Sequence, residues 1–207
     1  MLIVKYPVLL LIACVLSFPI YAEAEEVQVA VASNFLNPLK EITERYTRDT
    51  GNTLILISGS TGKLYAQVRH GAPFDILLAA DAKRPALLEK EGLGVGGTRF
   101  TYAVGALILW SPDPERVKGK ETLKSIEKGK LAIANPKTAP YGRAARETLE
   151  NLRLWKKLKP LLVRGENISQ TLQFVATGNA GLGFVAKSQL EDRRMKLKGS
   201  WWEIPAK

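Results

Sequence analysis

Hydroxyl and amide side chains occur at four points of the sequence where helices are expected to begin. Each point follows a strand-like stretch, in some cases after a loop. The first turn of a helix leaves backbone N–H groups without partners, and these carry partial positive charge. Uncharged hydroxyls beside such groups can help bind an anion by hydrogen bonding alone. The four segments are Ser33-Asn34, Ser60-Thr61, Ala139-Pro140-Tyr141-Gly142 and Asn167-Ile168-Ser169.

Each segment also has an ordinary structural interpretation. Ser, Thr and Asn are the usual N-cap residues, so each segment taken singly predicts only a helix cap. Gly59 and Gly62 are turn residues in the same interpretation. The interpretation as a site depends on recurrence in both halves of the chain, because ligands of open α/β sheets bind outside the carboxyl ends of the strands.

Two cations fall within these helix beginnings. Lys63 and Arg143 lie in the first turn of a predicted helix, where a positive charge opposes the helix dipole by about 0.3–1 kcal/mol. A bound anion nearby would remove that penalty. The alternative is a solvated side chain at little cost, since such interactions are weak and screened by salt.

Residues for other chemistry are sparse. His70 is the sole histidine, and its place in the last turn of a helix predicts a structural role, so a Ser-His-Asp triad would depend on it alone. Asp75 and Asp81 flank a strand, although Asp81 is better placed to cap the next helix. One Cys and one His build no Cys/His metal cluster, and no GxxxxGK(S/T) phosphate-binding loop is present. We expect no enzyme activity and no cofactor.

Alternating strands and helices must position these segments. The β-α-β-α order in the first half predicts a parallel sheet with helices on its faces, and the pattern repeats in the second half. We therefore expect two α/β lobes with a cleft between them. The run 100–110 is too long for an average strand and could cross between lobes. The expected strands are 27–32, 53–57, 75–80, 100–110, 131–134, 161–163, 181–186 and 201–204.

The N-terminus reads as a targeting segment. Lys5 precedes an apolar run over Tyr6–Ile20, and Ala22-Glu23-Ala24 is a small-x-small cleavage site. Fifteen apolar residues are short for a membrane-spanning helix. We expect a signal peptide over residues 1–24 and a periplasmic protein. The alternative is a lipid anchor at Cys14, because Leu11-Ile12-Ala13-Cys14 resembles a lipoprotein cleavage box.

The composition is that of a globular protein. Apolar residues make up 46% and charged residues 24% of the 207 residues, which argues against disorder. Lys and Arg number 30 against 20 Asp and Glu, so the net charge is +10. Such a charge attracts nucleic acid, an anionic membrane or an anionic solute. Export makes nucleic acid the least favoured of the three.

An ordered set of short motifs covers about residues 27–204. The motifs are VAVASNF (29–35), GSTGKL (59–64), GAPFD (71–75), AD (80–81), NP (135–136), APYG (139–142), GENI (165–168) and GLGFV (181–185). The set resembles the ModA family, the periplasmic molybdate-binding proteins of ABC transporters. The resemblance implies a two-lobed type II periplasmic binding protein fold. It also implies a tetrahedral oxyanion, molybdate or tungstate, held in the ligand cleft between the lobes.

The ligand residues that the resemblance implies are uncharged and come from both lobes. They are Ser33, Asn34, Ser60 and Thr61 from the first lobe, and Tyr141 and the Ile168 backbone amide from the second. Of these, Ser33, Ser60, Tyr141 and Ile168 would hold the molybdate, with Thr61 as an extra donor. Some members carry a Tyr ligand where this chain has Ala186, whereas others use the Tyr of the APYG motif, here Tyr141.

The expected domains are a signal peptide (1–24), a discontinuous first lobe (25–104 plus 196–207) and a second lobe (105–195). Family members usually continue past the segment matching Ile204-Pro205, so we expect the first lobe to lack a strand and a covering helix.

The expected partners are the oxyanion and the permease and ATPase of a molybdate ABC transporter, with a monomeric protein and no nucleic acid. Two alternatives remain. One is a binding protein for another solute, such as sulfate, phosphate or a metal ion. The other is an exported enzyme or sensor on the same fold.

Overall fold

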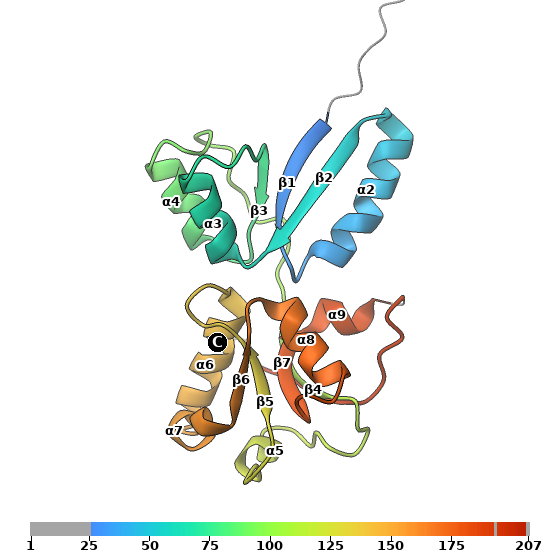
Figure 1. The fold of residues 1–207 in the computed structure, drawn as a ribbon, viewed down its shortest axis with the longest axis vertical. Coiled ribbons are helices and arrows are strands. Elements are labelled where there is room, and N and C mark those ends of the chain that lie inside the picture. The colour runs from blue at the N-terminus through green and yellow to red at the C-terminus, as the bar shows by residue number, and fades with distance from the viewer. Residues whose placement is uncertain (1–25, 193, 206–207) are drawn as a thin grey trace, which may run out of the picture.

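The computed structural model describes residues 26–192 and 194–205, and these form two α/β lobes stacked along the long axis of the molecule (Figure 1). The first lobe has a three-stranded sheet in the order β2-β1-β3, and the second a five-stranded sheet in the order β6-β5-β7-β4-β8. The predicted two-lobed α/β fold is confirmed. The expected signal peptide, residues 1–24, and Cys14 lie outside the described residues. No described helix is long and apolar enough to cross a membrane.

The first lobe is a parallel sheet between helices. Strand β1 is its centre, and residues 29–32 are at most 2% exposed, as expected for a parallel strand covered on both faces. Figure 1 shows α2 on one side of this sheet and α3 and α4 on the other. The elements are β1 (Glu26–Ala32), α2 (Leu36–Thr50), β2 (Thr53–Gly59), α3 (Thr61–Arg69), β3 (Ile76–Leu78) and α4 (Lys83–Lys90).

The second lobe is a mixed sheet. Strand β5 runs parallel to β6 and β7, whereas β4 pairs antiparallel with β7 and β8. Its strands are β4 (Leu107–Ser111), β5 (Leu131–Ala134), β6 (Leu162–Gly165), β7 (Leu182–Ala186) and β8 (Ser200–Glu203). Its helices are α5 (Glu121–Lys124), α6 (Pro140–Asn151), α7 (Trp155–Leu158), the 3₁₀ helix η1 (Lys159–Leu161), α8 (Ile168–Ala176) and α9 (Lys187–Glu191).

The segment that connects the lobes contains a shorter strand than the sequence predicted. The predicted strand 100–110 is a strand only as β4, over Leu107–Ser111, and residues 98–106 form an irregular segment that leads from the first lobe to the second. The five residues of β4 are buried because both faces of the strand are covered. Leu107 and Leu109 belong to one apolar cluster, and Ile108 and Trp110 belong to another.

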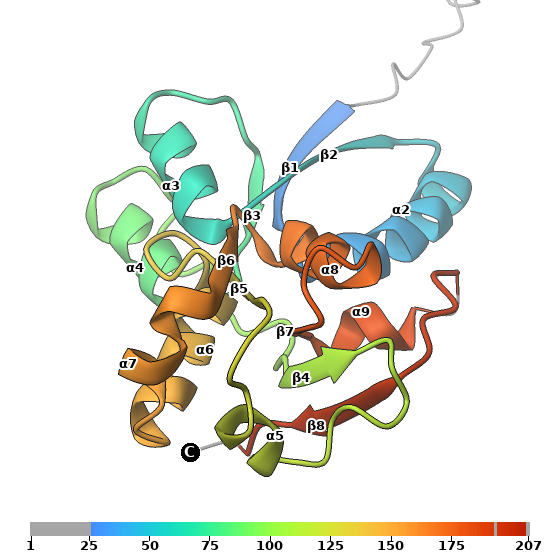
Figure 2. The same ribbon diagram turned by 60° about the horizontal axis from the view of Figure 1, so that its bottom comes forward.

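The expected placement of residues 196–207 in the first lobe is wrong for the described part of that range. Strand β8 lies beside β4 in the second lobe (Figure 2), with Leu109 opposite Trp202 and Trp110 opposite Trp201. Trp202 and Ile204 pack against the core of that lobe. Without β8, one edge of the buried strand β4 would have no hydrogen-bond partner, which is costly for a covered backbone.

Candidate anion-binding site

The four segments singled out in the sequence meet between the lobes. Strands β1 and β2 run toward the second lobe (Figure 1), and Ser33-Asn34 and Ser60 follow their carboxyl ends. Tyr141 lies in the first turn of α6, and Ile168 is the first residue of α8. One small cavity of about 10 Å³ is lined by all six predicted residues and five others: Ala32, Ser33, Asn34, Gly59, Ser60, Thr61, Ala80, Ala139, Pro140, Tyr141 and Ile168.

The cavity wall is uncharged, and its hydroxyls are not fully used within the protein. Ser33, Ser60 and Thr61 are at most 6% exposed. The Ser60 Oγ is buried and has no hydrogen-bond partner among the described residues. The Thr61 Oγ1 accepts a hydrogen bond from the Ala80 amide at 3.0 Å, which leaves its own hydrogen free to donate. A buried hydroxyl without a partner is costly unless a ligand or water completes it.

Tyr141 contributes a protonated hydroxyl. Burial raises its pKa above the usual value near 10, and the side-chain hydrogen bond with Asn34 opposes this only in part. The hydroxyl therefore keeps its proton at neutral pH and remains a donor. Burial and the neighbouring Tyr141 also raise the pKa of Tyr102 to about 12, and the Tyr102 hydroxyl donates to the Ala79 carbonyl at 2.8 Å.

Helices α3, α6 and α8 begin at the cavity, and α2 begins shortly after Asn34. The caps of α8, α3 and α2 distinguish the two interpretations of the sequence. Asn167 is an ordinary N-cap, since its side chain accepts a hydrogen bond from the Gln170 amide at 2.9 Å. Ser60 holds the N-cap position of α3 without making the side-chain bond of a cap. The expectation that Ser33 and Asn34 cap α2 is wrong, because the N-cap is Phe35. Ser33 and Asn34 lie in the turn before it and line the cavity.

Other candidate residues take structural roles. His70 is the exposed C-cap of α3, as expected. Asp75 accepts a hydrogen bond from the Gln28 amide at 2.7 Å. Asp81 accepts a hydrogen bond from the Arg84 amide at 3.1 Å, and so caps the first turn of α4.

The Asp81 carboxylate also forms ion pairs with two guanidinium groups. It pairs with Arg84 and, across the lobes, with Arg143 at 3.0 Å. Burial alone would raise the pKa of Asp81, but hydrogen bonds and charge from Arg84 and Arg143 outweigh this effect. They hold the pKa below its usual value near 3.8. Neither sequence interpretation of Arg143 anticipated this ion pair.

Lys63, the other first-turn cation, pairs with Glu166 of the second lobe at 2.6 Å. Gly105, which sequence reasoning missed, faces the Tyr141 hydroxyl so closely that a β-carbon there would overlap it. No sequence signal marks Gly105, because it lies outside helices and strands and its partner is distant in the chain.

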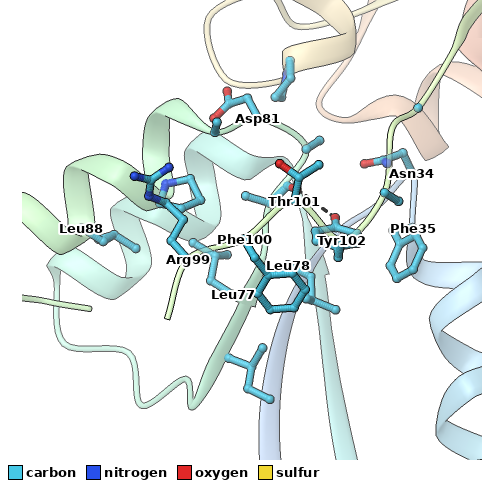
Figure 3. Close-up of a pocket in the computed structure, with 18 of the residues that line it drawn as sticks. Asn34, Phe35, Leu77, Leu78, Asp81, Leu88, Arg99, Phe100, Thr101 and Tyr102 are labelled. Atoms are coloured by element: carbon cyan, nitrogen blue, oxygen red, sulfur yellow. Dashed lines mark hydrogen bonds between the residues drawn. The ribbon is translucent and has the colours of Figure 1, made fainter. Parts of the chain in front are cut away.

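A larger groove of about 1040 Å³ adjoins the cavity and shares Asn34, Ala80, Pro140 and Tyr141 with it. Figure 3 shows Leu77, Leu78 and Phe100 on its wall, with Asp81 and Asn34 at its edge. All three residues of the edge strand β3 line the groove, and several large apolar side chains around it are exposed. They are Ile76, Leu93, Val95, Phe100 and Val104.

Two α/β lobes around an uncharged cavity built from helix beginnings define a solute-binding protein. The chain matches the family described as bacterial extracellular solute-binding protein over residues 27–207. The chain therefore belongs to that family, and within it to the ModA family that its motifs resemble. The description of the family agrees with the expected export.

Relatives are similar over most of the chain. The molybdate-binding protein ModA of Azotobacter vinelandii is 51% identical over 89% of this chain and 73% of its own length. That of Rhodobacter capsulatus is 46% identical over 94% of this chain and 76% of its own length. The solved structure of the Azotobacter vinelandii periplasmic molybdate-binding protein has a TM-score of 0.83 and 38% identity over 87% of this chain and 79% of that one. These relatives are named as binding proteins, in agreement with the expectation of no enzyme activity.

Proposed function

We propose that this protein captures molybdate or tungstate in the cavity between its lobes and delivers the anion to the permease and ATPase of an ABC transporter. The observation that carries the proposal is the buried Ser60 hydroxyl, which has no partner among the described residues. Ser60 lines the same cavity as the first residues of α3, α6 and α8. The names of the relatives support molybdate as the ligand.

The donor set suits a dianion. Burying an isolated dianion costs on the order of tens of kcal/mol, and each hydrogen bond to a charged group offsets about 1.5–3 kcal/mol. About seven such bonds are therefore needed. Six donors line the cavity, and the amides and dipoles of the first helical turns add to them. The six are the Ser33, Ser60, Thr61 and Tyr141 hydroxyls, the Asn34 side-chain amide and the Ile168 backbone amide.

The ligand enters by a movement of the lobes. The cavity of about 10 Å³ is close to the size of one water-sized probe. The two walls must therefore separate to admit a tetrahedral oxyanion and then close on it. The bound anion raises the share of the closed form, and the permease recognises the surface of that form. Export by the segment 1–24, or lipid anchoring at Cys14, places the protein outside the cytoplasmic membrane, and it acts as a monomer.

Calorimetric titration with molybdate, tungstate, sulfate and phosphate tests the proposal. We expect binding of molybdate and tungstate, and weak or no binding of the smaller sulfate, which would make looser contacts. Preferential binding of sulfate or phosphate would show that this anion, and not molybdate, is the ligand. Binding of none of the four would refute the proposal.

Ser60→Ala tests the residue that carries the proposal. Loss of one hydrogen bond to a charged ligand predicts about 10- to 100-fold weaker molybdate binding. Ser58→Ala is the matched control, because Ser58 is an exposed residue of β2 that does not line the cavity. Its affinity should equal that of the unaltered protein.

A further inference from the structure

Four hydrogen-bonded contacts join the lobes next to the proposed ligand donors. In two of them a hydroxyl of the second lobe donates to a first-lobe carbonyl: Ser169 to Ser33 at 3.2 Å and Ser188 to Asn34 at 3.0 Å. The other two involve Gly62 and Asp81. The Gly62 amide in α3 donates to the Thr138 carbonyl of the second lobe at 2.8 Å. The Asp81 carboxylate of the first lobe accepts from the Arg143 guanidinium of α6 at 3.0 Å. Gly62 follows Thr61 in the chain, and Arg143 lies two residues after Tyr141. Any separation of the lobes that opens the cavity therefore stretches the contacts of Gly62 and Asp81.

Gly62 allows the lobes to approach as closely as they do. A β-carbon at this position would lie 2.8 Å from the Thr138 carbonyl oxygen and 3.0 Å from the Thr138 Cα. These are backbone atoms of the opposite lobe, so no side-chain rotation relieves the overlap. Gly62 has no positive φ, and its position within the helix α3 does not itself require glycine. The close approach between the lobes is therefore the reason that glycine fits here.

Asp81 is well placed to hold the second lobe. Its side chain is 11% exposed, and those of Arg84 and Arg143 are 14% and 39% exposed, so the carboxylate end of both ion pairs is shielded from water and salt. Arg84 also crosses the lobes, because its Nη2 donates to the Lys137 carbonyl at 3.3 Å. By contrast, the pair between Lys63 and Glu166 has side chains 54% and 58% exposed and contributes little, as is usual for surface ion pairs.

We propose that the pairs Gly62–Thr138 and Asp81–Arg143, here termed the closure latch, hold the lobes shut and set the rate at which the bound oxyanion leaves. This inference rests on the proposed function. An anion enclosed between the lobes leaves only when they open, and contacts made only in the closed form lower the free energy of that form. The residues of the closure latch are positioning residues, and the neutral donors of the cavity remain the groups that contact the anion.

The rate of release separates the closure latch from a direct role of Arg143. In Arg143→Gln and Asp81→Asn, we expect labelled molybdate to leave the loaded protein about tenfold or more faster in a chase with excess unlabelled tungstate. The association rate should change little, since variants of one interface differ mainly in release. If the Arg143 guanidinium instead contacted the anion, Asp81→Asn would free it and would slow release or leave it unchanged. That result would overturn the proposal.

Gly62→Ala tests the closure latch without altering a charge. The added methyl group should keep the lobes apart and raise the release rate, while each lobe stays folded because alanine favours the helix. Lys63→Gln is the control for an exposed inter-lobe pair and should change the release rate by less than about twofold. Release at the unaltered rate in both Gly62→Ala and Arg143→Gln would overturn the proposal.

Small-angle X-ray scattering separates failure of the closure latch from failure of the proposed function. The latch predicts a larger radius of gyration for Gly62→Ala and Arg143→Gln than for the unaltered protein, with or without anion. If the unaltered protein binds none of the oxyanions, the proposed function fails, and this comparison still decides the latch. Equal radii in all three proteins would overturn it.

Discussion

Gly105→Ala should weaken oxyanion binding although Gly105 makes no contact with the anion in this account. A β-carbon at position 105 would overlap the Tyr141 hydroxyl and lie 3.2 Å from the Tyr141 Cζ, so the hydroxyl must leave its place. Gly105 is exposed, lies outside helices and strands, and has no positive φ. Alanine therefore fits the backbone there, and the fold should be retained.

The magnitude follows from one lost donor. A hydrogen bond to a charged group contributes about 1.5–3 kcal/mol, which corresponds to about 10- to 100-fold weaker binding. Tyr141→Phe removes the same donor and should show a loss of similar size. Because the two changes act on one hydroxyl, the double variant should bind little more weakly than either single variant.

Calorimetric titration measures the molybdate affinity of Gly105→Ala, of Tyr141→Phe and of the double variant. Gly96→Ala is the matched control, since a β-carbon at Gly96 would meet no atom within 4 Å. Unaltered affinity in Tyr141→Phe would remove Tyr141 from the site. Unaltered affinity in Gly105→Ala, with weak binding in Tyr141→Phe, would refute the close approach of Gly105 and Tyr141.

Two further predictions concern stability and the surface. The folded-state pKa of Asp81 is lowered below about 3.8, so its stabilising contribution is complete above the unfolded-state pKa and is lost as the pH falls through the folded-state pKa. The melting temperature of the ligand-free protein should therefore fall more steeply below about pH 4 than that of Asp81→Asn, and parallel curves would contradict this. Phe100 and Val104 are 77% and 93% exposed beside the groove. Changing both to Ser should lower the fluorescence of a bound hydrophobic dye without weakening molybdate binding, and an unchanged dye signal would show that the groove is covered in solution.

The sequence predicted the order of the elements well because the signals for that order are local. The buried run of β1, the turn at Gly59-Ser60 and the helix that follows can each be read within a few residues. The recurrence of helix beginnings after strands in both halves, with a cleft expected between the lobes, also predicted that Ser60 and Tyr141 would come together. Ligands of open α/β sheets bind outside the carboxyl ends of the strands, and here two such ends face one cleft.

What the sequence could not predict depends on partners far along the chain. Lys63 and Arg143 were expected to face an anion or water, and instead each pairs with an acidic residue of the opposite lobe. The pairing of β8 with β4 likewise depends on which edge of a sheet is open, which no pattern within residues 200–203 reveals. The role of Gly105 depends on its close approach to the Tyr141 hydroxyl, and Tyr141 lies in α6, far along the chain.

The most direct test of the central claim is a crystal structure of the protein grown with molybdate, with data collected to locate molybdenum by anomalous scattering. We predict one molybdenum peak between the lobes, with anion oxygens within hydrogen-bond distance of the Ser33, Ser60 and Tyr141 hydroxyls and the Ile168 amide. A cavity without molybdenum, or molybdenum bound only at the basic surface, would contradict the claim that uncharged donors from both lobes hold the anion.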